Sequence, residues 1–220
     1  MKPVVILFDV NETLLDMLPL KAKVNSLFKS ENAFRIWFGM LLHYSLVDNC
    51  TGQYHDFVSI ANATLDMTAE VMQVSISNDE KKDALSTIKM LAAYPDVKAG
   101  LTLLKQAGFR LATLTNSPMP TLIAQLEYAG LTTYFEEMLS IDSVKKYKPA
   151  PETYQFAAQK LGVNTNEILM VAAHGWDVNG ALIAGMQGAF IEREGQSLYS
   201  LSPQPGYIAK DLIAFANAII

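Results

Sequence analysis

The feature that most constrains the fold is a short apolar stretch near the start of the chain. Val4 to Phe8 contain no polar residue, and the next residue is Asp9. An apolar run without alternation predicts a strand that is buried on both faces of a parallel sheet. Asp9 then lies at the carboxyl end of that strand, where open α/β sheets bind their ligands. It is either a nucleophile facing a crevice or only a turn former or helix cap, and this stretch alone leaves both open.

The second half of the chain alternates between predicted strands and helices. The strands that follow the first one are predicted at residues 109–114, 138–141, 167–172, 189–191 and 207–209. Such alternation is typical of an α/β protein with a mostly parallel, Rossmann-like sheet and helices on both faces.

The segment between the first strand and this alternation is predicted to be helical. It contains only two glycines, Gly39 and Gly52, and its apolar residues recur with helical periodicity. The helices are predicted at residues 20–29, 33–47, 53–65, 68–75 and 79–93. We therefore expect a helical domain of residues 17–94, inserted into a core domain of residues 1–16 and 95–220.

Composition excludes several classes of protein. The chain has 220 residues, a net charge of -5 and no basic stripe, which argues against binding to nucleic acid. No apolar run reaches the length of a membrane span, and the first residues lack the organisation of a signal peptide. The single cysteine, Cys50, rules out an internal disulfide and suits a reducing compartment. We expect a cytoplasmic protein.

Polar residues follow four of the predicted strands. Because the carboxyl ends of parallel strands share one edge of a sheet, these residues can converge. Each also has a structural explanation, as a helix cap or a solvated charge, and only their joint placement predicts a site. The residues in question are Asp9, Asn11 and Thr13, then Thr115 and Asn116, then Lys148, and finally His174 and Asp177.

These residues resemble the motifs of the haloacid dehalogenase superfamily. Asp9 and Thr13 match its first motif, Thr115–Asn116 the second, Lys148–Pro149 the third and Asp177 the fourth. Within the superfamily the chain is most similar to the metal-independent L-2-haloacid dehalogenases. The resemblance implies that the helical insert is a cap domain, that the substrate is a small organic acid and that the protein forms a homodimer. It implies no metal and no cofactor.

Two positions separate this reading from a phosphatase of the same superfamily. A phosphatase needs a general acid two residues after the nucleophile, where this chain has Asn11. It also needs Mg²⁺, and one of the two acidic positions that hold the ion in the fourth motif is Ala173 here. Both replacements weaken phosphoryl transfer, and neither weakens attack on carbon.

The resemblance implies a mechanism with a covalent ester. Asp9 attacks C2 of a 2-haloacid and expels the halide, and water then cleaves the ester. Lys148 keeps Asp9 ionised, and Asp177 holds Lys148 and helps to activate the water. Thr13 and the Thr115–Asn116 turn hydrogen-bond the carboxylates of enzyme and substrate, and Tyr154 matches a tyrosine of the family's pocket.

Other positions depart from the family pattern. The arginine that meets the halide is replaced by Phe38, and Arg35, one helical turn earlier, either substitutes for it or is a surface charge. His174 replaces an asparagine, and either donates to substrate or water or is a buried histidine with satisfied hydrogen bonds. Asn11 stands where the family has a tyrosine. A Mg²⁺-dependent phosphatase and a non-catalytic module that binds small acids therefore remain as alternatives.

Overall fold

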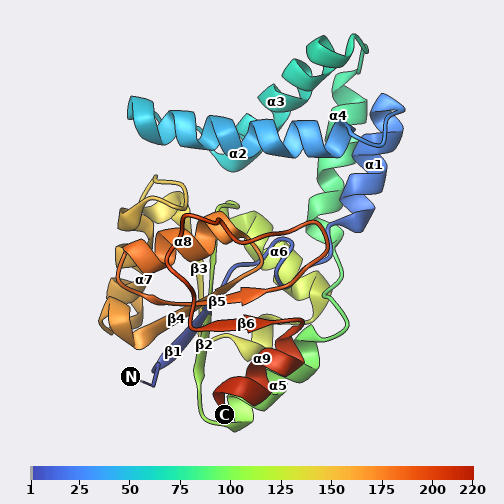
Figure 1. Cartoon of the computed structure of the whole chain (residues 1–220). Helices are drawn as coiled ribbons and strands as arrows, with labels where there is room; N and C mark the ends of the chain where they lie inside the picture. Colours follow the sequence, from blue (N-terminus) through green and yellow to red (C-terminus); the bar gives the residue numbers. More distant parts are fainter. Residues whose placement is uncertain (1) are drawn as a thin grey trace.

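The computed structural model describes residues 2–220, which build an α/β core and a layer of helices beside it (Figure 1). The core is a six-stranded sheet in the order β3-β2-β1-β4-β5-β6, and every neighbouring pair is parallel. The strands are β1 (Val5–Phe8), β2 (Arg110–Thr115), β3 (Glu137–Ser140), β4 (Ile168–Ala172), β5 (Gln187–Ile191) and β6 (Tyr207–Ala209). The predicted α/β fold is confirmed.

The strand β1 is central and is covered on both faces. Its four residues have no exposed surface. Ile6 and Phe8 face one hydrophobic cluster, whereas Val5 and Leu7 face the other, as alternation along a strand requires. The unbroken apolar run at the start of the chain is therefore explained by a core on each side of the sheet.

The helices of the core form the two outer layers. The first cluster includes residues of α5, α6 and α9, and the second includes residues of α7 and α8. Their bounds are α5 (Val97–Gln106), α6 (Met119–Ala129), α7 (Pro151–Leu161), α8 (Gly175–Ile183) and α9 (Leu212–Ile219), with short 3-10 turns η2 (Thr132–Tyr134), η3 (Ile141–Ser143) and η4 (Thr165–Glu167). The helix α8 ends at Ile183, two residues before Gly185 takes a φ of 87°.

Four helices follow β1 and lie together on one side of the core, at the top of Figure 1. They are α1 (Leu18–Phe28), α2 (Ala33–Thr51), α3 (Phe57–Met72) and α4 (Asn78–Ser86), and α4 continues into the 3-10 turn η1 (Thr87–Met90). Asn49 of α2 bonds the backbone of Tyr147 in both directions, at 2.8 and 2.9 Å. Because Tyr147 follows β3, this contact holds α2 beyond the carboxyl ends of the strands.

The helix boundaries in this segment differ from the prediction. The helices expected at 53–65 and 68–75 are one helix, α3, which begins after Asp56, whose carboxylate accepts from two backbone N–H groups. Thr68 lies inside α3, where its hydroxyl donates to Thr64 O at 2.7 Å, so it does not start a helix. The helix expected at 79–93 also stops early, since Leu91 takes an extended conformation.

Among residues 2–220, no helix is long and apolar enough to span a membrane.

Candidate active site

The loop after β1 presents Asp9 at the carboxyl edge of the sheet. Its backbone N–H donates to Val171 O at 3.0 Å, which continues the pairing of β1 with β4. The chain then turns back, and the Thr13 hydroxyl donates to Asp9 Oδ2 at 2.7 Å. The same hydroxyl accepts from the N–H of Ala173 at 2.9 Å. Thr13 therefore links the nucleophile candidate to the loop after β4.

Lys148 joins the two acidic residues of the site. Its ammonium donates to Asp9 Oδ1 at 2.8 Å, to Asp177 Oδ2 at 2.6 Å and to Leu114 O at 3.0 Å. These bonds use all three of its hydrogens. Its backbone N–H donates to Asn116 Oδ1 at 2.9 Å. The third motif is thereby fixed to the second.

Asp177 lies in the first turn of α8 and has no exposed surface. Its second carboxylate oxygen, Oδ1, accepts from the Tyr154 hydroxyl at 2.6 Å. Burial raises the pKa of Asp177, and the Lys148 ammonium opposes that shift. Asp177 thus serves as the anchor of Lys148, and Tyr154 as the anchor of Asp177.

Electrostatics keep Asp9 ionised. Burial alone would raise the pKa of its carboxyl, but the positive charges and hydrogen bonds of Lys148 and His174 outweigh burial and hold the pKa well below its usual range. Burial would likewise lower the pKa of Lys148, and the carboxylates of Asp177 and Asp9 raise it instead. At neutral pH the site therefore contains a carboxylate and an ammonium in contact, which suits a carboxylate nucleophile.

His174 forms a second cationic contact to Asp9. Its Nδ1 lies 3.0 Å from Asp9 Oδ2 and its Nε2 lies 2.8 Å from Glu12 Oε2, while its ring stacks on Trp176. Burial would lower the pKa of His174, but the hydrogen bonds and charges of Asp9 and Glu12 raise it to about 10. His174 is therefore an imidazolium at neutral pH, and both of its ring nitrogens donate.

Glu12 is a site residue that the sequence reasoning missed. Because Glu12 is an acid in the same loop as Asp9, its position could have suggested a site residue. Nothing in the sequence, however, indicated that its side chain would contact His174. Its backbone φ is 59°, in the left-handed region that glycine favours.

A cavity of about 460 Å³ opens beside these residues. Its lining includes Glu12, His174, Trp176, Arg35 and Phe38. The Trp176 ring also lies 5.9 Å from the Lys148 ammonium, so the cavity borders the buried charges. Arg35 is exposed and Phe38 half-buried, and both are therefore placed where a substrate could contact them.

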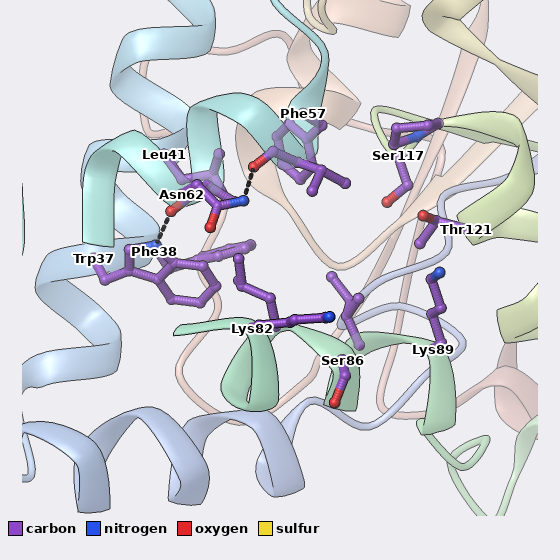
Figure 2. A pocket seen from close by; sticks show the side chains of 15 residues that line it. Trp37, Phe38, Leu41, Phe57, Asn62, Lys82, Ser86, Lys89, Ser117 and Thr121 are labelled. Atoms are coloured by element: carbon purple, nitrogen blue, oxygen red, sulfur yellow. Dashed lines mark hydrogen bonds between the residues drawn. The ribbon is translucent and has the colours of Figure 1, made fainter. Parts of the chain in front are cut away.

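A second cavity, of about 310 Å³, shares Phe38 in its lining with the first. Figure 2 shows Trp37 and Phe38 on one side of it and Ser117 and Thr121 on the other. Its walls are mostly apolar, with Lys82 and Lys89 among the residues of α4 and η1 that line it.

Three predicted substrate contacts have their polar atoms committed to protein partners instead. Asn11 donates to Ser117 Oγ at 3.2 Å and accepts from Gln125 Nε2 at 2.8 Å. The Thr115 hydroxyl accepts from the Ser117 N–H at 3.1 Å. Tyr154, with no exposed surface, donates to Asp177. In the structure these side chains position the loops of the site and do not face the 460 Å³ cavity.

The donor set around Asp9 does not suit a divalent cation. Asp9 Oδ2 already faces an imidazolium, and a metal ion there would meet like charge. Both oxygens of Asp177 have partners, and Ala173 offers no side-chain ligand. No cluster of three or more His, Cys, Asp or Glu residues with the geometry of a metal site occurs in the part of the chain from residue 2 to 220.

A carboxylate and an ammonium held in contact at the carboxyl edge of a parallel sheet are the groups that a hydrolase with a carboxylate nucleophile needs there. The chain belongs to the haloacid dehalogenase-like hydrolases, whose family model matches residues 4–185.

Several similar proteins of known structure or name are 2-haloacid dehalogenases. (S)-2-haloacid dehalogenase 1 of Pseudomonas sp. (strain CBS-3) is 34% identical over 176 residues, which are 80% of this chain and 78% of that protein. The solved structure of L-2-haloacid dehalogenase RSc1362 is 25% identical, with a TM-score of 0.95, over 100% of this chain and 99% of that one. An L-2-haloacid dehalogenase from Xanthobacter autotrophicus, solved with chloropropionic acid covalently bound, shares the fold at 23% identity and a TM-score of 0.91, over 99% and 98% of the two chains.

Proposed function

We propose that this protein hydrolyses the carbon–halogen bond of a small 2-haloacid through an aspartyl ester. The observation that carries the proposal is the buried cluster of Asp9, Lys148 and Asp177, in which the Lys148 ammonium donates to both carboxylates. Relatives that are named 2-haloacid dehalogenases support the same chemistry.

In the first step, Asp9 attacks C2 of the substrate and the halide leaves with the bonding electron pair. Lys148 orients the carboxylate through Oδ1 and, being buried itself, holds it in a fixed direction. We assign the halide contact to Arg35, because this exposed cation lines the cavity that borders the site. Phe38 forms an apolar wall of the same cavity.

In the second step, water attacks Cγ of the Asp9 ester and releases a 2-hydroxyacid. The family resemblance implies that Asp177 helps to activate this water. Both carboxylate oxygens of Asp177 are bonded to Lys148 and Tyr154, and the residue is fully buried. We therefore assign Asp177 the role of holding Lys148 in place.

The alternatives are less well supported by the contacts. For phosphoryl transfer, the side chain of Asn11 would have to act as an acid, yet it is an amide tied to Ser117 and Gln125. A non-catalytic module would have no need of an ionised carboxylate held at high desolvation cost by Lys148 and His174.

We also propose that residues 17–94 are a cap domain over the core of residues 1–16 and 95–220. The Tyr54 hydroxyl donates to Asp142 at 2.7 Å, and Gln125 donates to Ile88 O at 2.9 Å, so two hydrogen bonds connect the helical segment to the core. The homodimer and the cytoplasmic location remain our expectations, the first from the resemblance and the second from the single cysteine.

One paired assay tests the function. Halide release is measured with each enantiomer of 2-chloropropionate, and aryl phosphate hydrolysis is measured with and without Mg²⁺. We expect halide release that does not depend on metal. Hydrolysis of the phosphate alone, dependent on Mg²⁺, would establish the phosphatase instead, and no turnover of either would favour the binding module.

A further inference from the structure

The pair of Glu12 and His174 has no part in the mechanism above, although it contacts the reacting carboxylate. The His174 side chain is only 6% exposed, yet it borders the 460 Å³ cavity and lies 3.0 Å from Asp9 Oδ2. Glu12 bonds the opposite ring nitrogen at 2.8 Å. A cation held between two carboxylates at a reacting atom calls for a chemical explanation.

The backbone of Glu12 points to the same pair. A non-glycine residue in the left-handed region is strained, and such residues concentrate at functional sites. With a φ of 59°, Glu12 bears this strain in the loop that carries Asp9 and Thr13. The conformation brings its carboxylate to the His174 ring.

The two oxygens of Asp9 differ in their hydrogen bonds. Within residues 2–220, Oδ2 accepts from Thr13 and His174, whereas Oδ1 accepts from Lys148 alone. Since a carboxylate oxygen has two lone pairs, Oδ1 retains one for bond formation and Oδ2 does not. Oδ1 is therefore the oxygen that bonds to the substrate carbon, and Oδ2 becomes the carbonyl oxygen of the ester.

We propose that His174 is a catalytic residue of ester hydrolysis, whose imidazolium and the Thr13 hydroxyl form an oxyanion hole for Asp9 Oδ2, and that Glu12 is its positioning residue. This inference rests on the proposed aspartyl ester and assigns residues to its second step.

Hydrolysis of the ester proceeds by addition of water to Asp9 Cγ and then loss of the product from the same carbon. The water oxygen bonds to Asp9 Cγ, the carbonyl π pair moves onto Oδ2, and one proton of the water passes to the cavity solvent. The charge on Oδ2 is met by Nδ1–H of His174 and by the Thr13 hydroxyl. The Oδ2 pair then re-forms the double bond, and the Cγ–Oδ1 bond breaks. Oδ1 leaves with the bonding pair of Cγ–Oδ1 and takes the second proton of the water, so it becomes the hydroxyl oxygen of the product. Asp9 is then a carboxylate again, with the water oxygen in place of Oδ1.

Glu12 keeps the ring charged during this step. Esterification neutralises Asp9, so His174 loses one of its two anionic partners, and Glu12 is the carboxylate that still bonds it. The other charged groups around the ring are Lys148 with Asp177 behind it, and Asp16, Lys21, Arg35 and Glu194 along the cavity. Without Glu12, the ring would lose its proton at lower pH once the ester has formed.

The test separates the two steps with His174→Gln. A rapid-quench experiment measures the first equivalent of halide, and intact-protein mass spectrometry measures ester on Asp9. We expect kcat to fall about 10²–10³-fold, as for loss of one oxyanion-hole donor. The first halide equivalent should appear at close to the wild-type rate, with ester accumulating. Equal slowing of both steps without accumulated ester would overturn the proposal, as would unchanged kcat.

A second variant and controls complete the test. Glu12→Gln should move the alkaline limb of the kcat–pH profile to lower pH, and an unmoved limb would contradict its assigned role. The exposed His43→Gln is the matched control and should behave as wild type. Thermal unfolding of each variant verifies that it is folded. If the wild-type enzyme forms neither halide nor ester, the proposed function itself fails; if the wild type turns over and His174→Gln is unaffected, only this inference fails.

Discussion

The ammonium of Lys148 lies 2.8 Å from Oδ1 of Asp9, although 139 residues separate them in the chain. Parallel pairing of β1 with its neighbours brings the loops that carry the two residues to one edge of the sheet. The contact is fully buried and is extended to Asp177 on the far side of the ammonium. We expect both the stability and the chemistry of the site to depend on this contact.

Replacement of Asp9 by Asn should abolish dehalogenation. An amide is a poor nucleophile, so halide release from 2-chloropropionate should fall by about 10⁴-fold or more, as for loss of other catalytic nucleophiles. Ion chromatography of released chloride measures the change. Asp66→Asn, at an exposed acid paired with Lys81, is the control and should retain full activity. Full activity of Asp9→Asn would refute the mechanism.

Replacement of Lys148 by Met should destabilise the protein strongly. The change leaves the buried carboxylates of Asp9 and Asp177 without their shared cation, and breaking such a pair costs about 3–5 kcal/mol. Urea unfolding measures the loss. Lys81→Met breaks a pair whose acid, Asp66, is 56% exposed, and should cost about 1 kcal/mol or less. Similar losses in the two variants would contradict this account.

Replacement of Tyr154 by Phe tests whether this residue supports Asp177. The variant removes the 2.6 Å bond to Asp177 Oδ1 and leaves a buried acceptor unsatisfied, at about 1–3 kcal/mol. Because Tyr154 is fully buried, we expect the KM for substrate to remain unchanged while the unfolding free energy and kcat fall. A rise in KM alone would indicate a substrate contact. Tyr128→Phe, at an exposed tyrosine, should be neutral in both measurements.

Stability should decline on the alkaline side of neutrality because of His174. Its pKa is raised from 6.5 to about 10 in the folded protein. The contribution of His174 to the free energy of unfolding is therefore complete below pH 6.5 and is lost as the pH rises to about 10. At about 1.4 kcal/mol per pKa unit, the free energy of unfolding should fall by a few kcal/mol over this interval. Urea titrations at a series of pH values measure it. The decline should be much smaller in His174→Gln, and an identical decline would assign the effect to another group.

Arg35 and Lys89 offer a matched comparison between the two cavities. Arg35→Gln removes a cation from the 460 Å³ cavity. It should lower kcat/KM for 2-haloacids about 10-fold or more, because loss of a hydrogen bond to a charged group has an effect of that size. Lys89→Gln changes the 310 Å³ cavity of Figure 2 and should leave kcat/KM unchanged. The reverse result would move the substrate to the cavity of Figure 2. Steady-state halide release measures both.

The core was accessible to sequence reasoning because local patterns determine it. The apolar run from Val4 to Phe8 indicates that β1 is buried on both faces, and glycines and prolines mark most helix ends. The α/β fold and its parallel sheet could therefore be predicted. The boundaries within the helical segment were less accessible. Thr68 resembles a helix start in sequence, but a threonine can also bond the preceding turn from inside a helix, and only the packing of α3 decides between the two.

The sequence by itself determined which residues meet at the carboxyl edge of the sheet, because Asp9, Lys148 and Asp177 each follow a predicted strand of a parallel sheet. Only the tertiary structure decided what each side chain does at that edge. It directs Asn11 and Tyr154 to protein partners, and it turns Glu12 toward His174. The physical reason is that a hydrogen bond depends on the direction of the side chain and on which buried polar groups nearby still need a partner. The spacing of residues along the chain specifies neither of these.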